Sequence, residues 1–136
     1  MSDLGAIGFY LGMTITRDRP NRMLRLGQHS YITKVLRDFG MEDCKPVVTP
    51  MDINGSNLVP APKDYLASPF EIKEYQKLIG SLMYAMLGSR PDIAFAVSMV
   101  SRFAANPTAE HIIAAKRILR YLRGTLTYQL TYRGDL

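Results

Sequence analysis

Few residues in this sequence have the side chains and the spacing that catalysis requires. General acid–base or metal-assisted catalysis needs several ionisable groups that converge on one point. The only adjacent acidic pair, Glu42-Asp43, follows an expected helix and is expected to be solvated. The two histidines, His29 and His111, lie near expected helix starts, and we expect both at the surface. The chain has no G-x-S-x-G motif, no P-loop and no G-x-G-x-x-G motif, so nothing in it indicates an enzyme that acts alone.

The single cysteine gives no stronger signal. Cys44 precedes Lys45, whose positive charge is expected to lower the pKa of the thiol slightly, and we interpret it as an incidental thiol. One cysteine and two histidines cannot supply a four-ligand zinc site, and one cysteine cannot form an internal disulfide. We therefore expect no metal and no cofactor in this chain.

The basic residues are more informative. Between His111 and Gly134 there is no acid but there are five bases: Lys116, Arg117, Arg120, Arg123 and Arg133. At about 100° per residue, Lys116, Arg120 and Arg123 share a helix face, with Arg117 beside them and an apolar stripe opposite. Such a ridge attracts phosphates regardless of base sequence. It is also typical of a helix face that is basic only for solubility, so charge alone leaves both interpretations open.

Two further features lie near basic residues. Tyr121 falls within the same stretch, where its ring is expected to be able to stack on a base or sugar. A second basic cluster surrounds an expected hairpin and is diluted only by Asp18; it consists of Arg17, Arg19, Arg22 and Arg25. Two basic regions on separate elements favour nucleic-acid contact modestly.

Length and composition set the class. The chain has 136 residues, of which 47% are hydrophobic and 21% are charged, which excludes a disordered tail. Its formal net charge is +5 and its pI is about 9.5. No apolar stretch approaches the ~20 residues that cross a bilayer, and the first residues do not read as a signal peptide. We expect a soluble, intracellular protein, cytoplasmic or nuclear, with no membrane partner.

The hydropathy pattern predicts an α+β chain. Residues 7–26 are expected to form a β-hairpin, with one strand over 7–15, a turn at 18–22 and a second strand from Met23 to Leu26. A helix follows from Gln28, with an apolar stripe that ends at Phe39 and a C-terminal cap at Gly40. Residues 41–68 contain four prolines and no periodicity, which indicates a tether or an extended segment across a surface.

The second half is expected to be an antiparallel helical bundle. Start signals occur at Ser68-Pro69-Phe70-Glu71, at Ser89-Arg90-Pro91-Asp92 and at Thr108. Alternation from Leu126 to Tyr132 then predicts one orphan strand with no local partner. The expected divisions are 1–40 (hairpin and first helix), 41–68 (proline-rich linker), 69–124 (helices) and 125–136 (the strand).

The order of several blocks resembles the polyprotein of copia-type LTR retrotransposons, over nearly the whole chain. The blocks are Met1-x-Asp3-Leu4-Gly5 with Phe9-Tyr10-Leu11-Gly12-Met13, Leu26-x-Gln28 to Met41, Cys44-Lys45-Pro46 with Thr49-Pro50-Met51, Tyr75-x-x-Leu78 to Tyr84, Arg90-Pro91-Asp92-Ile93-Ala94, and Ala115 to Leu126. Any one block can arise by chance, but six in this order make the resemblance specific.

The resemblance implies a fragment of a larger polymerase fold, within a reverse transcriptase. It would comprise the end of the palm and the thumb or connection, just before ribonuclease H. It assigns a primer-grip role to Phe9, Leu11 and Gly12, and duplex clamping suits the ridge of Lys116, Arg117, Arg120 and Arg123. The family's catalytic aspartates, which hold Mg²⁺ ions in the intact polymerase, are expected before Met1, and the ribonuclease H carboxylates beyond Leu136. This chain would not polymerise DNA alone.

Several roles remain open at this point. The favoured one is positioning of a template–primer duplex, an RNA–DNA hybrid or duplex DNA. The alternatives are a freestanding nucleic-acid-binding module, a protein-interaction piece that joins other polymerase segments, and a retroelement relic without function. Because the hairpin edge and the last strand are expected to be unpaired, self-association is also expected.

Overall fold

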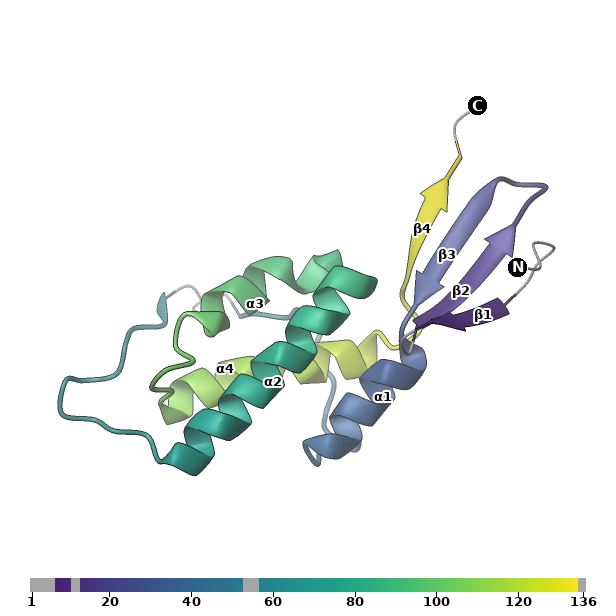
Figure 1. Cartoon of the computed structure of the whole chain (residues 1–136). Coiled ribbons are helices and arrows are strands. Elements are labelled where there is room, and N and C mark those ends of the chain that lie inside the picture. Colours follow the sequence, from purple (N-terminus) through teal and green to yellow (C-terminus); the bar gives the residue numbers. More distant parts are fainter. Residues whose placement is uncertain (1–6, 11–12, 53–56, 135–136) are drawn as a thin grey trace.

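The computed structural model describes residues 7–10, 13–52 and 57–134, which form an antiparallel sheet and a group of helices (Figure 1). The sheet has four strands in the order β1-β2-β3-β4: β1 (Ile7–Tyr10), β2 (Met13–Asp18), β3 (Met23–Gly27) and β4 (Gln129–Arg133). The helices are α1 (His29–Asp38), α2 (Pro69–Gly88), α3 (Ala94–Ser101) and α4 (Ala109–Gly124), with a short 3-10 helix, η2 (Pro91–Ile93), before α3. The α+β class is confirmed.

The first strand predicted from the sequence is two strands in the structure. β1 pairs with β2 in an antiparallel register from Ile7 opposite Thr16 to Tyr10 opposite Met13. The chain therefore reverses direction where the sequence predicted one strand over 7–15. Gly12, which the prediction assigned to the interior of that strand, lies outside the described residues. The turn at 18–22 and the strand after it are confirmed.

The prediction of an orphan strand at the C-terminal end is wrong. β4 pairs with β3 in antiparallel register, from Met23 opposite Arg133 to Gly27 opposite Gln129. Two strands can pair wherever they meet in space, however far apart they lie in the sequence. Here α4 brings the chain back to β3, so that β4 pairs with a strand about a hundred residues earlier. β4 covers the edge of the hairpin that the sequence left open.

Two predicted helix starts, at Ser68 and Thr108, and one predicted helix end, at Gly40, are confirmed. Gly40 ends α1 with a φ of +66°, a conformation that favours glycine. Ser68 caps α2: its hydroxyl accepts a hydrogen bond from Glu71 N, and the Glu71 carboxylate accepts one from Ser68 N. Thr108 caps α4 in the same way. Ser89, however, lies at the C-terminal cap of α2, and the chain passes through η2 before α3 starts.

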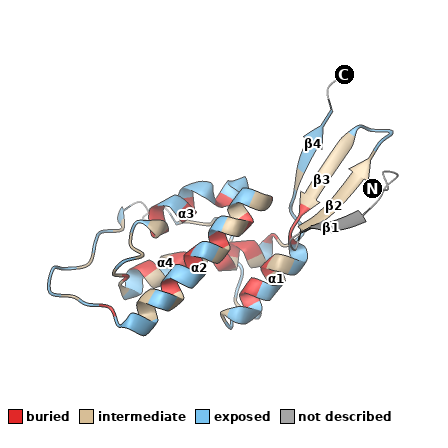
Figure 2. Ribbon diagram, in the orientation of Figure 1, coloured by how far each residue is buried: buried red, intermediate tan, exposed pale blue. Residues whose placement is uncertain are grey.

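The hydrophobic core lies among the helices, which reverse direction from α2 to α3 to α4 (Figure 1). Its fully buried members include Leu82 of α2, Val100 of α3, and Ile118 and Leu119 of α4. Buried residues are concentrated in this part of the molecule, whereas the sheet projects from it and is mostly half-buried or exposed (Figure 2). Met83 of α2, by contrast, is 42% exposed. No helix in the described part is both long enough and apolar enough to span a membrane.

Candidate functional site

Three arginines of α4 hold the proline-rich segment against that helix. Arg117 Nη2 donates to Thr49 Oγ1 (3.0 Å), Arg120 Nε to the carbonyl of Lys45 (2.8 Å), and Arg123 Nε to the carbonyl of Glu42 (2.6 Å). The segment and the helix therefore run beside each other over residues 42–49. Of the two interpretations of this segment, a tether or a strip across a surface, the contacts at 42–49 match the second.

The same contacts leave the positive charge of the arginines in place. All three acceptors are neutral oxygens, and all three arginines are half-buried. A guanidinium has five N–H donors, so each side chain keeps donors beyond the bond that it makes to the segment. Arg117 Nε is buried and has no hydrogen-bond partner among the described residues. The row thus keeps its positive charge and spare donors, while two carboxylates, those of Asp52 and Glu110, line a hollow together with Arg117 and Arg120.

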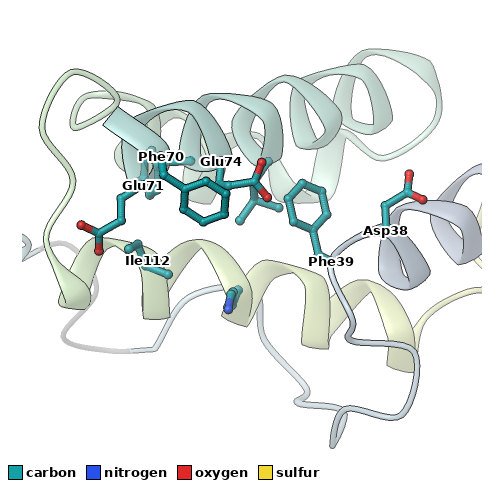
Figure 3. Close-up of a pocket in the computed structure, with 9 residues that line it drawn as sticks. Asp38, Phe39, Phe70, Glu71, Glu74 and Ile112 are labelled. Carbon is teal, nitrogen blue, oxygen red and sulfur yellow. The ribbon is translucent and has the colours of Figure 1, made fainter. Parts of the chain in front are cut away.

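Lys116 lies apart from these arginines. It lines a hollow of about 300 Å³ between the C-terminal end of α1, the start of α2 and α4. Three carboxylates, those of Asp38, Glu71 and Glu74, line the same hollow with Phe39 and Phe70 (Figure 3). The surroundings of Lys116 are therefore acidic, and the structure does not join it with the three arginines in one exposed row.

The structure also contains a buried cluster that the sequence analysis did not predict. Arg90 is 1% exposed. Its guanidinium donates to both carboxylate oxygens of Asp92 (3.1 and 2.9 Å) and to the carbonyl and hydroxyl of Thr125 (3.0 and 2.6 Å). It also lies 5.6 Å from the ring centre of Tyr121 and 5.1 Å from that of Tyr128. In the sequence, this ion pair is indicated only by the acidic residue two positions after Arg90, and the pattern Ser89-Arg90-Pro91-Asp92 predicts a helix start instead.

Tyr121 belongs to this cluster, so the expectation that its ring can stack on a base is wrong. Its side chain is buried, and its hydroxyl donates to Asp92 Oδ2 at 2.5 Å. Position on the helix explains the difference, because Tyr121 lies between the buried residues Leu119 and Leu122 and faces η2 rather than solvent.

These contacts make the stability of the fold depend on pH. Burial raises the pKa of the Asp92 carboxyl, but the hydrogen bonds from Arg90 and Tyr121 outweigh it and hold the pKa below its usual value. A carboxyl with a lowered folded-state pKa contributes stability above its unfolded pKa of about 4, and this contribution is lost as the pH falls through the folded value.

We expect wild type and Asp92→Asn to differ in free energy of unfolding by a constant amount above about pH 5, and to converge below about pH 4. Urea denaturation across this range measures it, and a difference that persists undiminished into strong acid would contradict the expectation.

The prediction of a surface position for His111 is also wrong. His111 is 1% exposed and stacks on Phe103, with ring centres 3.9 Å apart. Thr108 N donates to its Nδ1 (2.9 Å), and its Nε2 lies 2.7 Å from the carbonyl of Val59. These partners require a neutral ring with the proton on Nε2. His111 is a capping residue, while His29 is exposed as predicted.

The structure also gives the surroundings of Cys44 and the position of Phe9. Burial raises the pKa of the Cys44 thiol, more than the nearby Arg123 and Arg120 lower it, so the expected decrease is wrong. No group of three or more His, Cys, Asp or Glu that could hold a metal ion occurs in the described part of the chain. Of the residues expected in a primer grip, Phe9 lies in β1 opposite Thr14. Leu11, Gly12 and the side chain of Phe9 lie outside what the structure describes.

Several curated proteins are similar to this chain. The retrovirus-related Pol polyprotein from transposon TNT 1-94 of Nicotiana tabacum is 44% identical over 138 residues, which covers 99% of this chain and 10% of that polyprotein. The Pol polyprotein from transposon RE1 of Arabidopsis thaliana is 40% identical, over 92% of this chain and 8% of the relative. A putative transposon Ty5-1 protein of Saccharomyces cerevisiae is 34% identical, over 98% of this chain and 42% of the relative.

The chain thus spans much less than two thirds of the length of each of these relatives. No protein-family model matches it. No solved structure matches it either.

Proposed function

We propose that this chain, which is homologous across most of its length to Pol polyproteins of copia/Ty1-type retrotransposons, acts on nucleic acid. Its role in this proposal is to position the template–primer duplex for an RNA-directed DNA polymerase. In this proposal the chain contributes the thumb or connection and carries no catalytic group. Two-metal phosphoryl transfer needs carboxylates that hold both ions, and the resemblance assigns them to another segment of such polyproteins.

The observation that carries the proposal is the arginine row on α4. This row extends over about 9 Å of helix axis and consists of three half-buried residues, Arg117, Arg120 and Arg123. In the hydrogen bonds described above, their guanidinium groups donate only to neutral oxygens. Guanidinium groups suit phosphate because their planar donors match its oxygens. Since phosphate contacts position a duplex without reading its sequence, this row suits a clamp.

The segment at 42–49 supports the same role. A long arginine side chain loses conformational freedom when it binds, and the loss weakens binding. Here the bonds to Thr49 and to the carbonyls of Lys45 and Glu42 already restrict the three arginines. The segment therefore preorganises the row for a polyanion. The primer-grip role of Phe9, Leu11 and Gly12 is part of the proposal and rests on the resemblance.

The test is binding of a labelled RNA–DNA hybrid and a labelled DNA duplex to the 136-residue chain, measured by fluorescence anisotropy over a range of salt concentrations. For duplex DNA, the logarithm of the binding constant falls with the logarithm of salt by about 0.9 per phosphate contacted. We expect a steep slope for wild type and a slope smaller by about 0.9 for Arg120→Gln. Arg120→Lys keeps the charge and should keep the slope. Circular dichroism establishes that each variant is folded.

Lys116→Gln is the matched comparison on the acidic side of α4. Because Asp38, Glu71 and Glu74 line its surroundings, we expect this change to have a smaller effect on the slope than Arg120→Gln. Binding that ignores salt, or no binding to either duplex, would overturn the proposal. If the chain instead co-purified with other polymerase segments and had no affinity for nucleic acid, the protein-interaction role would replace it.

A further inference from the structure

We infer that the end of the sheet farthest from the helices is a second site for the phosphate backbone of a nucleic acid, formed by Arg17, Arg22 and Arg133 together with Tyr132. The turn between β2 and β3 and the end of β4 meet there, away from α4 (Figure 1). The inference rests on the proposed function for the class of ligand, but it concerns a different surface.

The register of the strands brings these residues together. Arg17 of β2, Leu24 of β3 and Tyr132 of β4 lie directly opposite one another in one row. Residues in such a row point to the same face of the sheet, and Arg17 and Tyr132 are two strand spacings apart, about 10 Å. Arg133 follows Tyr132 in β4 and so starts on the opposite face of the sheet. At the end of the sheet, however, Arg133 and Arg22 line the same hollow of about 390 Å³ as Arg17 and Tyr132. Residues nearly 120 positions apart in sequence thus line one surface.

The hollow is strongly basic. Four arginines (Arg17, Arg19, Arg22 and Arg133) and one acid, Asp18, line it, which gives a formal charge of +3. The Asp18 carboxylate already accepts hydrogen bonds from Asn21, at 2.8 Å from Nδ2 and 3.4 Å from N. Among the described residues, no hydrogen bond or ion pair engages the guanidinium groups of the three arginines that carry the inference. In the described part of the fold their charges therefore have no partner, and Arg22 and Arg133 are exposed while Arg17 is half-buried.

The backbone at Arg22 supports a role for its side chain. Arg22 has a φ of +52°, in the left-handed region where glycine or asparagine is usual. Its N–H donates to the carbonyl of Arg19 (3.0 Å), and its carbonyl accepts from Gly134 N (2.8 Å), so it ties the turn to the end of β4. Glycine would serve this turn with less strain. An arginine at such a position is the kind of local strain that concentrates at functional sites.

Tyr132 favours nucleic acid over a small anion. Its side chain is 53% exposed beside the arginines. Sites that track a nucleic-acid strand combine basic grooves with aromatic rings on which bases stack. A free phosphate ion would use the arginines alone. The chemistry on this surface therefore matches a phosphodiester strand with accessible bases, such as the end of a duplex with a single-stranded overhang.

The test removes the charges without removing the turn. The triple variant Arg17→Gln, Arg22→Gly and Arg133→Gln keeps the turn because glycine accepts a φ of +52°. With a duplex DNA that carries an overhang, we expect the salt slope to be smaller by about 2.7, or about 0.9 for each arginine. The corresponding triple lysine variant should keep most of the slope. Tyr132→Ala should lower affinity about fivefold or more at constant salt, whereas Tyr132→Phe should not.

The outcomes separate this inference from the proposed function. If the sheet variants bind like wild type while Arg120→Gln binds with a smaller slope, the second site is excluded and the proposed function stands. If the sheet variants weaken binding and Arg120→Gln does not, the second site is supported and the α4 row is excluded. Arg102, exposed at the end of α3, gives the control. A slope that falls as much per charge for Arg102→Gln would mean attraction to net charge alone and would overturn the inference. Binding of inorganic phosphate that the triple variant abolishes, together with duplex affinity that Tyr132→Ala leaves unchanged, would also overturn it, because the surface would then be a site for a small anion.

Discussion

Replacing Arg90 with alanine should lower the free energy of unfolding by about 3 kcal/mol, the upper end of the range for hydrogen bonds that involve a charged group, because the Arg90 side chain is buried while that of Asp92 is 36% exposed. Arg90 is almost fully buried, and its guanidinium makes four hydrogen bonds, two to Asp92 and two to Thr125. Alanine would leave Asp92 without the donor that holds its charge and Thr125 with an unsatisfied carbonyl. It would also remove the cation between the rings of Tyr121 and Tyr128.

Two further variants make this result specific. Arg90→Lys keeps the charge, but an ammonium group cannot reach two partners with the planar fork of a guanidinium, so we expect it to recover only a small part of the loss. Arg102→Ala removes an exposed arginine and should change stability by no more than about 0.5 kcal/mol. Urea denaturation followed by circular dichroism measures all three. A loss below about 1 kcal/mol for Arg90→Ala would show that the cluster does not hold the fold together.

The Arg90 cluster also gives a physical reason for one block of the resemblance. Arg90-Pro91-Asp92 lies between α2 and α3, and its side chains reach Tyr121 near the end of α4 and Thr125 just after it. The chain enters β4 a few residues later. Arg90 and Asp92 therefore fix the place where the helices pass into the sheet. In this chain the block has a structural role, and that role explains the presence of Arg90 and Asp92 without any contact with a ligand.

The helix starts could be predicted from the sequence because their causes are local. The hydroxyl of Ser68 needs only the N–H of Glu71 three residues later, and Thr108 has the same relation to His111. Gly40 likewise ends α1 through its own backbone conformation. These interactions lie within one helical turn, so a short window of sequence contains all the information they need.

The sheet could not be predicted in the same way because its pairing is not local. Leu130 lies opposite Leu26, about a hundred residues earlier in the chain. Alternation of apolar and polar residues shows that a segment can form a strand, but not which strand it joins. For this reason the strand was expected at the right place, while its partner was missed.

The basic residues of α4 illustrate the same limit at the candidate site. Their helical spacing was visible in the sequence, but the groups that they contact are 68, 75 and 81 residues away. An arginine that faces solvent and one that binds the carbonyl of a distant segment have the same sequence pattern. Only the fold shows that the surroundings of these two bases differ. Lys116 lines the acidic hollow, whereas Arg120 donates a hydrogen bond to the carbonyl of Lys45.

Leu82→Ala should destabilise the fold by about 2–5 kcal/mol, the range for removing a leucine side chain from a packed core. Leu82 is fully buried in the middle of α2, where it belongs to the core shared with α3 and α4. Alanine leaves a cavity that the surrounding helices can fill only in part. Because a domain of this size has a total stability of about 5–15 kcal/mol, the change removes a large fraction of it.

Leu87→Ala is the matched control, because it makes the same substitution in the same helix at a residue that is 81% exposed. We expect a change of no more than about 0.5 kcal/mol. Helix propensity favours alanine over leucine slightly at both positions, so the difference between the two variants isolates burial. If urea denaturation shows equal losses in the free energy of unfolding for the two variants, α2 does not direct Leu82 toward α3 and α4. The packing that holds α4, and with it the arginine row, in place would then be different from the packing described above.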